Sequence, residues 1–233
     1  MGATRGTRHP PRDTAFAAGR PGRYTVARMR ITGGELGGRR LKAPAGSRVR
    51  PTQDRVRGAL FSMLAAAVPG ARVLDLFAGT GAVGFEALSR GAADVVWIEA
   101  DRRQCAALKA ALAALGPGRP VRVACDDCLR WLRRPPDAAF DLVFADPPYE
   151  WAAAHGFAGI AARLRDGGWL RPGGLFVAEQ PATVPAAAWD GWELLRDRVY
   201  GQTRLAVYRM GALCKTEPCT PEPSTPSPSD TST

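Results

Sequence analysis

A chain of 233 residues can bury one full hydrophobic core, which favours a single main domain with additions over two equal domains. Hydrophobic residues make up 45% of it, but no apolar run approaches the roughly 18 residues that indicate a membrane-spanning helix. The N-terminus also lacks the apolar core of a secretory signal. We therefore exclude a membrane protein and expect a soluble, cytoplasmic protein.

The formal net charge of +10 is concentrated at the N-terminal end. Residues 1–72 contain 15 Lys/Arg against 3 Asp/Glu, whereas residues 73–233 contain 17 against 19. Guanidinium groups suit phosphates, and each neutralised phosphate releases counterions. The N-terminal third is therefore expected to contact a nucleic acid, with a merely solvated arginine-rich tail as the alternative.

Both ends of the chain lack a hydrophobic pattern. Residues 1–28 are rich in Arg, Gly and Pro and predict a disordered basic arm. A transit peptide is the alternative for this segment, and translation starting at Met29 instead of Met1 is left open. Residues 211–233 form a Pro/Ser/Thr-rich tail for which we also predict disorder.

Residues 29–70 predict a small extension before the main domain. The segment MRITGGELGGRRLKAP (29–44) is typical of a hairpin with glycine turns. Thr52 is placed to cap a helix with one apolar face. The apolar residues of that face are Val56, Leu60, Phe61 and Leu64.

The start of the predicted helix is basic. Arginines near a helix N-terminus are well placed to hold a phosphate. The alternatives are a surface helix with ion pairs to Asp54, and a cover over the ligand site of the main domain. The predicted nucleic-acid contacts are Arg39, Arg40, Arg50, Thr52, Arg55 and Arg57.

Residues 71–210 alternate short apolar strands with helical stretches. This alternation predicts an α/β, Rossmann-like domain with a mainly parallel sheet of seven strands and helices on both faces. Only Gly201 and Gln202 separate the last two strands, so we expect a hairpin that makes the last strand antiparallel. The predicted strands are residues 72–77, 94–99, 121–124, 141–145, 174–180, 192–200 and 203–210.

A glycine turn follows the first strand of this domain. Gly79, Gly81 and Gly84 match the G-x-G-x-x-G spacing, and Glu99 ends the next strand 20 residues after Gly79. This matches the dinucleotide fingerprint and on its own indicates an NAD-dependent oxidoreductase.

Asp75, inside the strand before the glycines, favours a different cofactor. Its charge would oppose a pyrophosphate but would attract the ammonium and sulfonium groups of S-adenosylmethionine. A carboxylate satisfied by turn amides is the alternative role for Asp75.

Cofactor contacts are expected at the carboxyl ends of the parallel strands. Glu99 and Asp101 should reach the ribose hydroxyls, and Asp127 the adenine amino group, with Asp126 as its rival. The predicted cofactor-binding residues are Asp75, Phe77, Gly79, Thr80, Gly81, Gly84, Glu99, Asp101 and Asp127.

The sequence DPPY (146–149) follows the fourth strand. The Asp146 carboxylate and the Pro147 carbonyl can accept hydrogen bonds from both N–H groups of an exocyclic amine, and the prolines fix that geometry. Tyr149 can stack on an unpaired base. The predicted catalytic residues are Asp146, Pro147, Pro148 and Tyr149.

The cysteines do not predict a metal site. CDDC (125–128) has metal-ligand spacing, but no second Cys pair or His pair accompanies it. We interpret the five cysteines as reduced thiols and predict no metal.

Several of these segments together carry a resemblance to a known family. They are MRITGGELGGRRL (29–41), RPTQDRVRGALFSML (50–64), DLFAGTGAVGFEALSRGA (75–92), IEAD (98–101), ADPPY (145–149) and GQTRLAVYR (201–209). Over about residues 29–210 the chain resembles class I methyltransferases, and more closely the bacterial 16S rRNA (guanine(966)-N(2))-methyltransferase family.

The resemblance implies S-adenosylmethionine as cofactor, 16S rRNA of the small ribosomal subunit as partner, and the 2-amino group of guanine 966 as acceptor. We expect a monomer. The residues alone leave open an adenine-N6 methyltransferase of DNA or RNA, and also an RNA-binding protein whose methyltransferase core is inactive.

Overall fold

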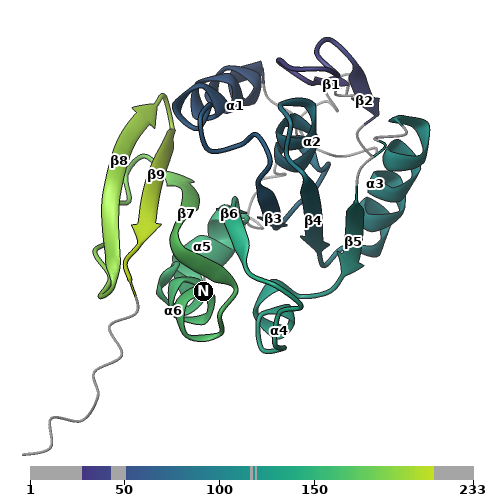
Figure 1. Cartoon of the computed structure of the whole chain (residues 1–233). Helices are drawn as coiled ribbons and strands as arrows, with labels where there is room; N and C mark the ends of the chain where they lie inside the picture. The colour runs from purple at the N-terminus through teal and green to yellow at the C-terminus, as the bar shows by residue number, and fades with distance from the viewer. Residues whose placement is uncertain (1–27, 43–50, 116–117, 119, 213–233) are drawn as a thin grey trace, which may run out of the picture.

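The computed structural model describes residues 28–42, 51–115, 118 and 120–212. A seven-stranded sheet forms the centre of the molecule, and a two-stranded sheet lies beside it (Figure 1). The predicted N-terminal arm and C-terminal tail fall almost entirely outside the described residues, as does Arg50.

The central sheet has the strand order β5-β4-β3-β6-β7-β9-β8. Its strands are β3 (Arg72–Leu76), β4 (Asp94–Glu99), β5 (Val121–Cys125), β6 (Phe140–Ala145), β7 (Leu170–Pro181), β8 (Trp192–Tyr200) and β9 (Thr203–Met210). The first five run parallel, while β9 is antiparallel to both β7 and β8. The mainly parallel sheet and the antiparallel last strand are thus confirmed.

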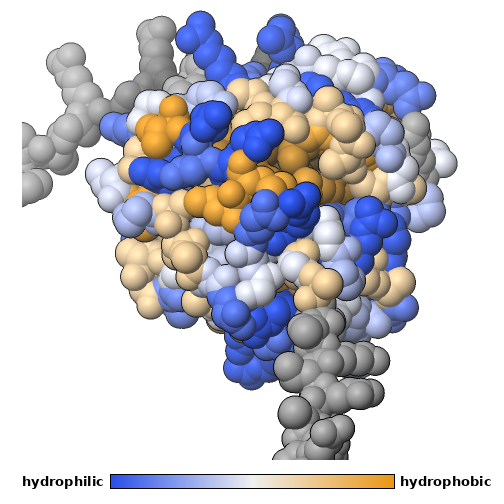
Figure 2. Space-filling view, turned by 60° about the vertical axis from the view of Figure 1, so that its left-hand side comes forward, coloured by the Kyte–Doolittle hydropathy of each residue, from blue (hydrophilic) through white to orange (hydrophobic). Residues whose placement is uncertain are grey.

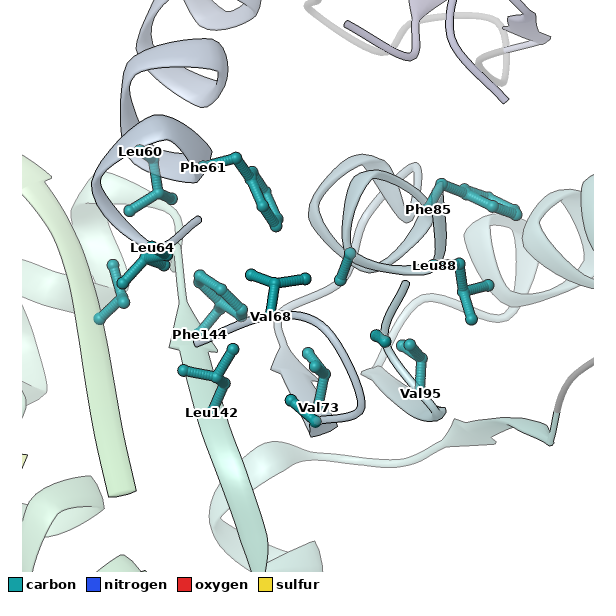
Figure 3. Close-up of a cluster of buried hydrophobic side chains, with 14 of the residues drawn as sticks. Leu60, Phe61, Leu64, Val68, Val73, Phe85, Leu88, Val95, Leu142 and Phe144 are labelled. Atoms are coloured by element: carbon teal, nitrogen blue, oxygen red, sulfur yellow. The ribbon is translucent and has the colours of Figure 1, made fainter. Parts of the chain in front are cut away.

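Helices cover both faces of this sheet and enclose two hydrophobic cores. One face packs against α1 (Pro51–Met63), α2 (Ala82–Ser89) and α3 (Arg102–Leu115). The other packs against α4 (Cys128–Trp131), α5 (Tyr149–His155) and α6 (Ala158–Asp166). Figure 3 shows the first core, where Leu60, Phe61, Leu64, Phe85 and Leu88 lie over Val73, Val95, Leu142 and Phe144.

Helix α1 uses the apolar face that its sequence predicts. Val56, Leu60, Phe61 and Leu64 are all buried. The helix begins at Pro51, so Thr52, the predicted cap, lies inside its first turn. Proline suits the first helical position because its missing N–H has no partner there in any helix.

A buried acid, Glu86 of α2, holds the N-terminal extension against the main domain. The hairpin strands β1 (Arg28–Arg30) and β2 (Arg40–Lys42) pair antiparallel. Thr32, between them, donates to Glu86 from its backbone N (2.7 Å) and from its hydroxyl (2.6 Å). Arg57 of α1 adds a bond at 3.3 Å and Arg90 one at 2.8 Å. One carboxylate therefore joins the hairpin, α1 and α2.

The sheet edge at β8 is mixed in character. Figure 2, turned so that this side comes forward, shows an apolar band between hydrophilic groups. Leu194 and Val199 of β8 are exposed, and so are the charged residues Glu193, Arg196 and Arg198 of the same strand. Charges along an edge strand oppose pairing with another sheet. Among the described residues, no helix is long and apolar enough to cross a membrane.

Candidate active site

A cavity of about 820 Å³ opens at the carboxyl ends of the parallel strands, where open α/β sheets bind ligands. Helix α1 and the β8–β9 turn complete its wall. The charged residues that line it are Asp75, Glu99, Asp126, Asp127, Asp146, Glu179 and Arg57. The wall is therefore predominantly acidic.

The glycine turn gives this cavity its backbone shape. Gly79 has a positive φ of 54°, and a side chain there would meet nothing closer than 3.8 Å, so its backbone is open to a ligand. Gly81 and Gly84 do not line the cavity: a Cβ would lie 2.3 Å from Leu108 and 2.2 Å from Trp97 respectively. These two glycines allow the turn to pack and do not face the ligand site.

Phe77 adopts a left-handed backbone conformation with φ of 62°, the only non-glycine residue of the described chain to do so. Such a conformation costs on the order of 1–3 kcal/mol for a bulky residue and is concentrated at functional sites. Its ring lines the cavity and contacts Trp151 edge-on, with 4.7 Å between ring centroids.

Asp75 lies at the base of the cavity and is 3% exposed. Burial raises the pKa of its carboxyl to about 8, and the charges of Asp146 and Glu99 act in the same direction. The backbone N of Gly84 donates to it at 3.1 Å and partly offsets this shift. Asp75 is thus both hydrogen-bonded by a turn amide and part of the cavity wall.

The acids at the end of β4 have two different roles. Glu99 accepts from the backbone N of Gly79 at 2.7 Å and from that of Asp101 at 2.7 Å, and it lines the cavity. Asp101 does not line it: its carboxylate accepts from Arg103 N at the start of α3. Asp101 is a helix cap here, contrary to its predicted position at the ribose.

Asp126 and Asp127 both line the cavity but differ in their partners. Asp126 has both oxygens engaged, one by Arg130 and one by Arg134 at 2.6 Å. Asp127 is exposed and uses one oxygen to cap α4 through Arg130 N at 2.9 Å. The more available acceptor is therefore Asp127.

The DPPY segment turns the chain from β6 directly into α5. Asp146 follows β6 and opens into the cavity, and reduced hydration there raises its pKa to about 6. Pro147 is buried, and Pro148 caps α5. Tyr149 begins the helix with 40% of its surface exposed. Acid, rigid turn and ring thus meet at the mouth of one cavity.

Residues 29–209 match a family model described as "Conserved hypothetical protein 95". The chain belongs to this family. It is 36% identical over 198 residues to "Ribosomal RNA small subunit methyltransferase D" of Escherichia coli (strain K12), covering 83% of this chain and 96% of that protein. The protein of the same name from Haemophilus influenzae is 33% identical over 183 residues, covering 78% and 93%.

Solved structures agree with the family match. The structure described as "Putative methyltransferase yhhF from Escherichia coli" superimposes with a TM-score of 0.71 at 34% identity, covering 80% of this chain and 99% of that one. The Rossmann-like class I methyltransferase fold predicted from the sequence is thereby confirmed.

The predicted RNA-binding residues of this family member do not form one exposed set. Arg39, Arg40 and Arg55 are exposed. Arg57 is 6% exposed and pairs with Asp54 at 2.9 Å as well as with Glu86. The alternative of a helix held by ion pairs is thus correct for Arg57, which is not free for a phosphate.

Among the cavity residues that the sequence prediction missed, three have side chains of chemical interest. Glu179 lies near the carboxyl end of β7, and Asp146 directly follows the neighbouring strand β6, a parallel that the strand GLFVAEQ could have revealed. Trp151, in the first turn of α5, gave no local signal. Gln104 of α3 also lines the cavity, and its buried side-chain oxygen has no hydrogen-bond partner within the described residues.

No group of three or more His, Cys, Asp or Glu side chains in the described part of the chain is arranged to hold a metal ion. Cys125 is exposed and Cys128 buried, and both are free thiols. Burial raises the pKa of Cys128 to about 12, which makes it a poor metal ligand at neutral pH.

Proposed function

We propose that the protein transfers a methyl group from S-adenosylmethionine to the 2-amino group of a guanine in 16S rRNA, namely guanine 966. The observation that carries this proposal is the position of Asp146 and Pro147 on the wall of an acidic cavity at the strand ends. The named relatives, which are small-subunit rRNA methyltransferases, support the substrate class.

The charge of the cavity favours S-adenosylmethionine over a nicotinamide dinucleotide. Six acids and one arginine are the charged residues that line it within the described chain. A pyrophosphate would meet repulsion at this wall, whereas an ammonium and a sulfonium would be attracted. The unpartnered oxygen of Gln104 suits a hydroxyl donor such as the ribose of the cofactor.

Each end of the cofactor has suitable residues in the cavity. Asp75 would hold the cationic amino acid portion, because its carboxylate is buried beside the glycine turn. Glu99 and Gln104 would hold the ribose, and Asp127 the adenine amino group. When bound, S-adenosylmethionine supplies a methyl group already activated by the sulfonium.

Asp146 and Pro147 position the nucleophile. An exocyclic amine is a weak nucleophile because its lone pair is delocalised into the ring. The Asp146 carboxylate and the Pro147 carbonyl accept its two N–H groups, and this holds the nitrogen in line with the methyl group. Alignment of this kind contributes up to about 7–11 kcal/mol in well-oriented reactions.

The proton balance follows from the same contacts. The nitrogen forms its new bond to carbon as the carbon–sulfur bond breaks, and the amine becomes acidic only at that stage. Its proton then passes to the Asp146 carboxylate. Tyr149 stacks on the base, which must leave its helix or be unpaired to enter the cavity. We propose that the protein acts as a monomer.

Mapping the modified nucleotide tests the proposal. The protein should be incubated with small subunits that lack the modification and with labelled S-adenosylmethionine, and the labelled nucleoside identified by mass spectrometry. We expect N2-methylguanine at position 966. Label on an adenine N6, or tight nicotinamide binding without S-adenosylmethionine binding, would contradict it.

A further inference from the structure

Glu179 is an acid of the cavity wall that none of the steps above uses. In the register of the sheet Ala145 of β6 lies beside Ala178 of β7, so Asp146 and Glu179 are the next residues on two neighbouring parallel strands. Neighbouring strands lie about 4.8 Å apart, and residues at equal height face the same side. The two carboxylates therefore face the same part of the cavity.

The surroundings of Glu179 leave its oxygens available. Burial raises the pKa of its carboxyl well above the ordinary value, the Asp146 charge adds to this, and Arg57 opposes it. Asp75 and Glu99 each accept a bond from a backbone amide, but no donor among the described residues bonds to Glu179. An acceptor without a donor thus lies beside Asp146 and Pro147, the pair that would hold the amine and that we call the amino-group clamp.

Guanine offers the donor that this acceptor lacks. On its Watson–Crick edge the 2-amino group lies beside N1–H, whereas in adenine the amino group lies beside a bare N1. Asp146 and Pro147 meet an amino group in both bases and cannot distinguish them. A second acceptor beside the clamp can do so.

We propose that Glu179, as the ionised carboxylate, accepts the N1–H of the target guanine and thereby selects guanine over purines that have an amino group beside a bare N1. This inference rests on the proposed function, since it concerns the base that the clamp holds.

The test compares guanine with 2-aminopurine, which keeps the 2-amino group but has a bare N1. Small subunits are reconstituted from ligated rRNA carrying either base at the methylated position, and kcat/KM is measured for each. Wild-type protein should prefer guanine by at least about tenfold, the discrimination of one good base contact. Glu179→Ala should lower turnover of guanine to near that of 2-aminopurine and leave 2-aminopurine almost unchanged.

Further variants separate recognition from folding. Glu179→Met fills a similar volume without a strong acceptor and should lose the preference as Ala does, which covers the case that Ala fails to fold. Glu179→Gln keeps a carbonyl acceptor and should retain more of the preference than Met. Glu150→Gln alters an exposed acid outside the cavity wall and is the matched control, with the wild-type preference expected.

The role of Glu179 would be overturned if Glu179→Met lowered kcat/KM equally on both bases or kept the preference for guanine. It would also be overturned if Glu179→Gln lost more of the preference than Glu179→Met. If the wild-type protein methylates no guanine, the proposed function itself fails. If it makes N2-methylguanine and the variants keep the preference, only the assignment of Glu179 fails.

Discussion

Glu86 and the acids of the cavity have opposite environments in this protein. Glu86 is completely buried, and donors from the hairpin, α1 and α2 surround it. Burial alone would raise its pKa, but the bonds from Thr32 and Arg90 and the charge of Arg57 hold it below the ordinary value. In the cavity, reduced hydration raises the pKa values of Asp75, Asp146 and Glu179, and no arginine or lysine among the described residues bonds to them to offset it.

The contrast separates structural from functional carboxylates. Glu86 stabilises the fold, and because it is fully buried among its donors it is closed to a ligand. An acid with open acceptors is destabilising unless a ligand supplies the missing donors or cation, so raised pKa values mark candidate sites. The predictions below test this division, from the largest expected effect to the smallest.

Substitution of Asp146 should have the largest effect on activity. Asp146→Ala removes both the acceptor and the final base and should reduce methyl transfer by roughly 10²–10⁴-fold. S-adenosylmethionine should still bind, as calorimetry can verify. Asp146→Asn keeps one acceptor oxygen and should be less impaired. Full activity in Asp146→Ala would contradict the proposal that Asp146 holds the target amino group.

Activity should also fall in acid because Asp146 must be ionised to accept from the amine. Its pKa is about 6, so the rate should be retained above pH 6 and lost as the pH falls through that value.

Substitution of Glu86 should instead affect stability. Glu86→Gln removes one of the two charge partners that the buried Arg57 has within the described chain and leaves only Asp54, and breaking a buried pair costs up to about 3–5 kcal/mol of unfolding free energy. Denaturant titration measures this. Since the pKa of Glu86 is lowered, its contribution is present above the unfolded value of 4.5 and is lost as the pH falls through the folded pKa. An unchanged denaturation midpoint in Glu86→Gln would contradict the claim that this residue holds the hairpin, α1 and α2 together.

Tyr149 should make a smaller contribution through its ring. Tyr149→Ala should cost on the order of 1–3 kcal/mol of base stacking, read as a loss of kcat/KM, whereas Tyr149→Phe should be mild. If Tyr149→Phe lowered kcat/KM as much as Tyr149→Ala, the hydroxyl group and not the ring would have the main role.

The exposed arginines should affect only the salt dependence of RNA binding. Substitution of Arg39, Arg40 and Arg55 by Gln should flatten the slope of log affinity against log salt by about one unit for each lost phosphate contact. The affinity for the cofactor should stay unchanged. An unchanged slope would contradict the proposal that these arginines contact RNA phosphates.

Local patterns were sufficient to predict much of this arrangement. The apolar strand runs predicted the sheet, and the glycine turn and DPPY predicted the cavity, because each depends on neighbours within a few residues. The face of Arg57 could not be predicted, since its partner Glu86 lies 29 residues away. The insertion of β9 between β7 and β8 and the site role of Glu179 likewise depend on long-range pairing.

The most direct test of the division between the two groups of acids is proton release when the cofactor binds. With a pKa of about 8, Asp75 should be largely protonated near pH 6.5 and should ionise when a cation binds beside it. Calorimetry in buffers of different ionisation enthalpy should detect about one released proton, and affinity should rise by up to about tenfold per pH unit below pH 8. In Asp75→Asn the part of the pH dependence of affinity that comes from Asp75 should disappear. The part that comes from titration of the cofactor's own ammonium group should remain. Identical pH dependence in wild type and Asp75→Asn would contradict the account.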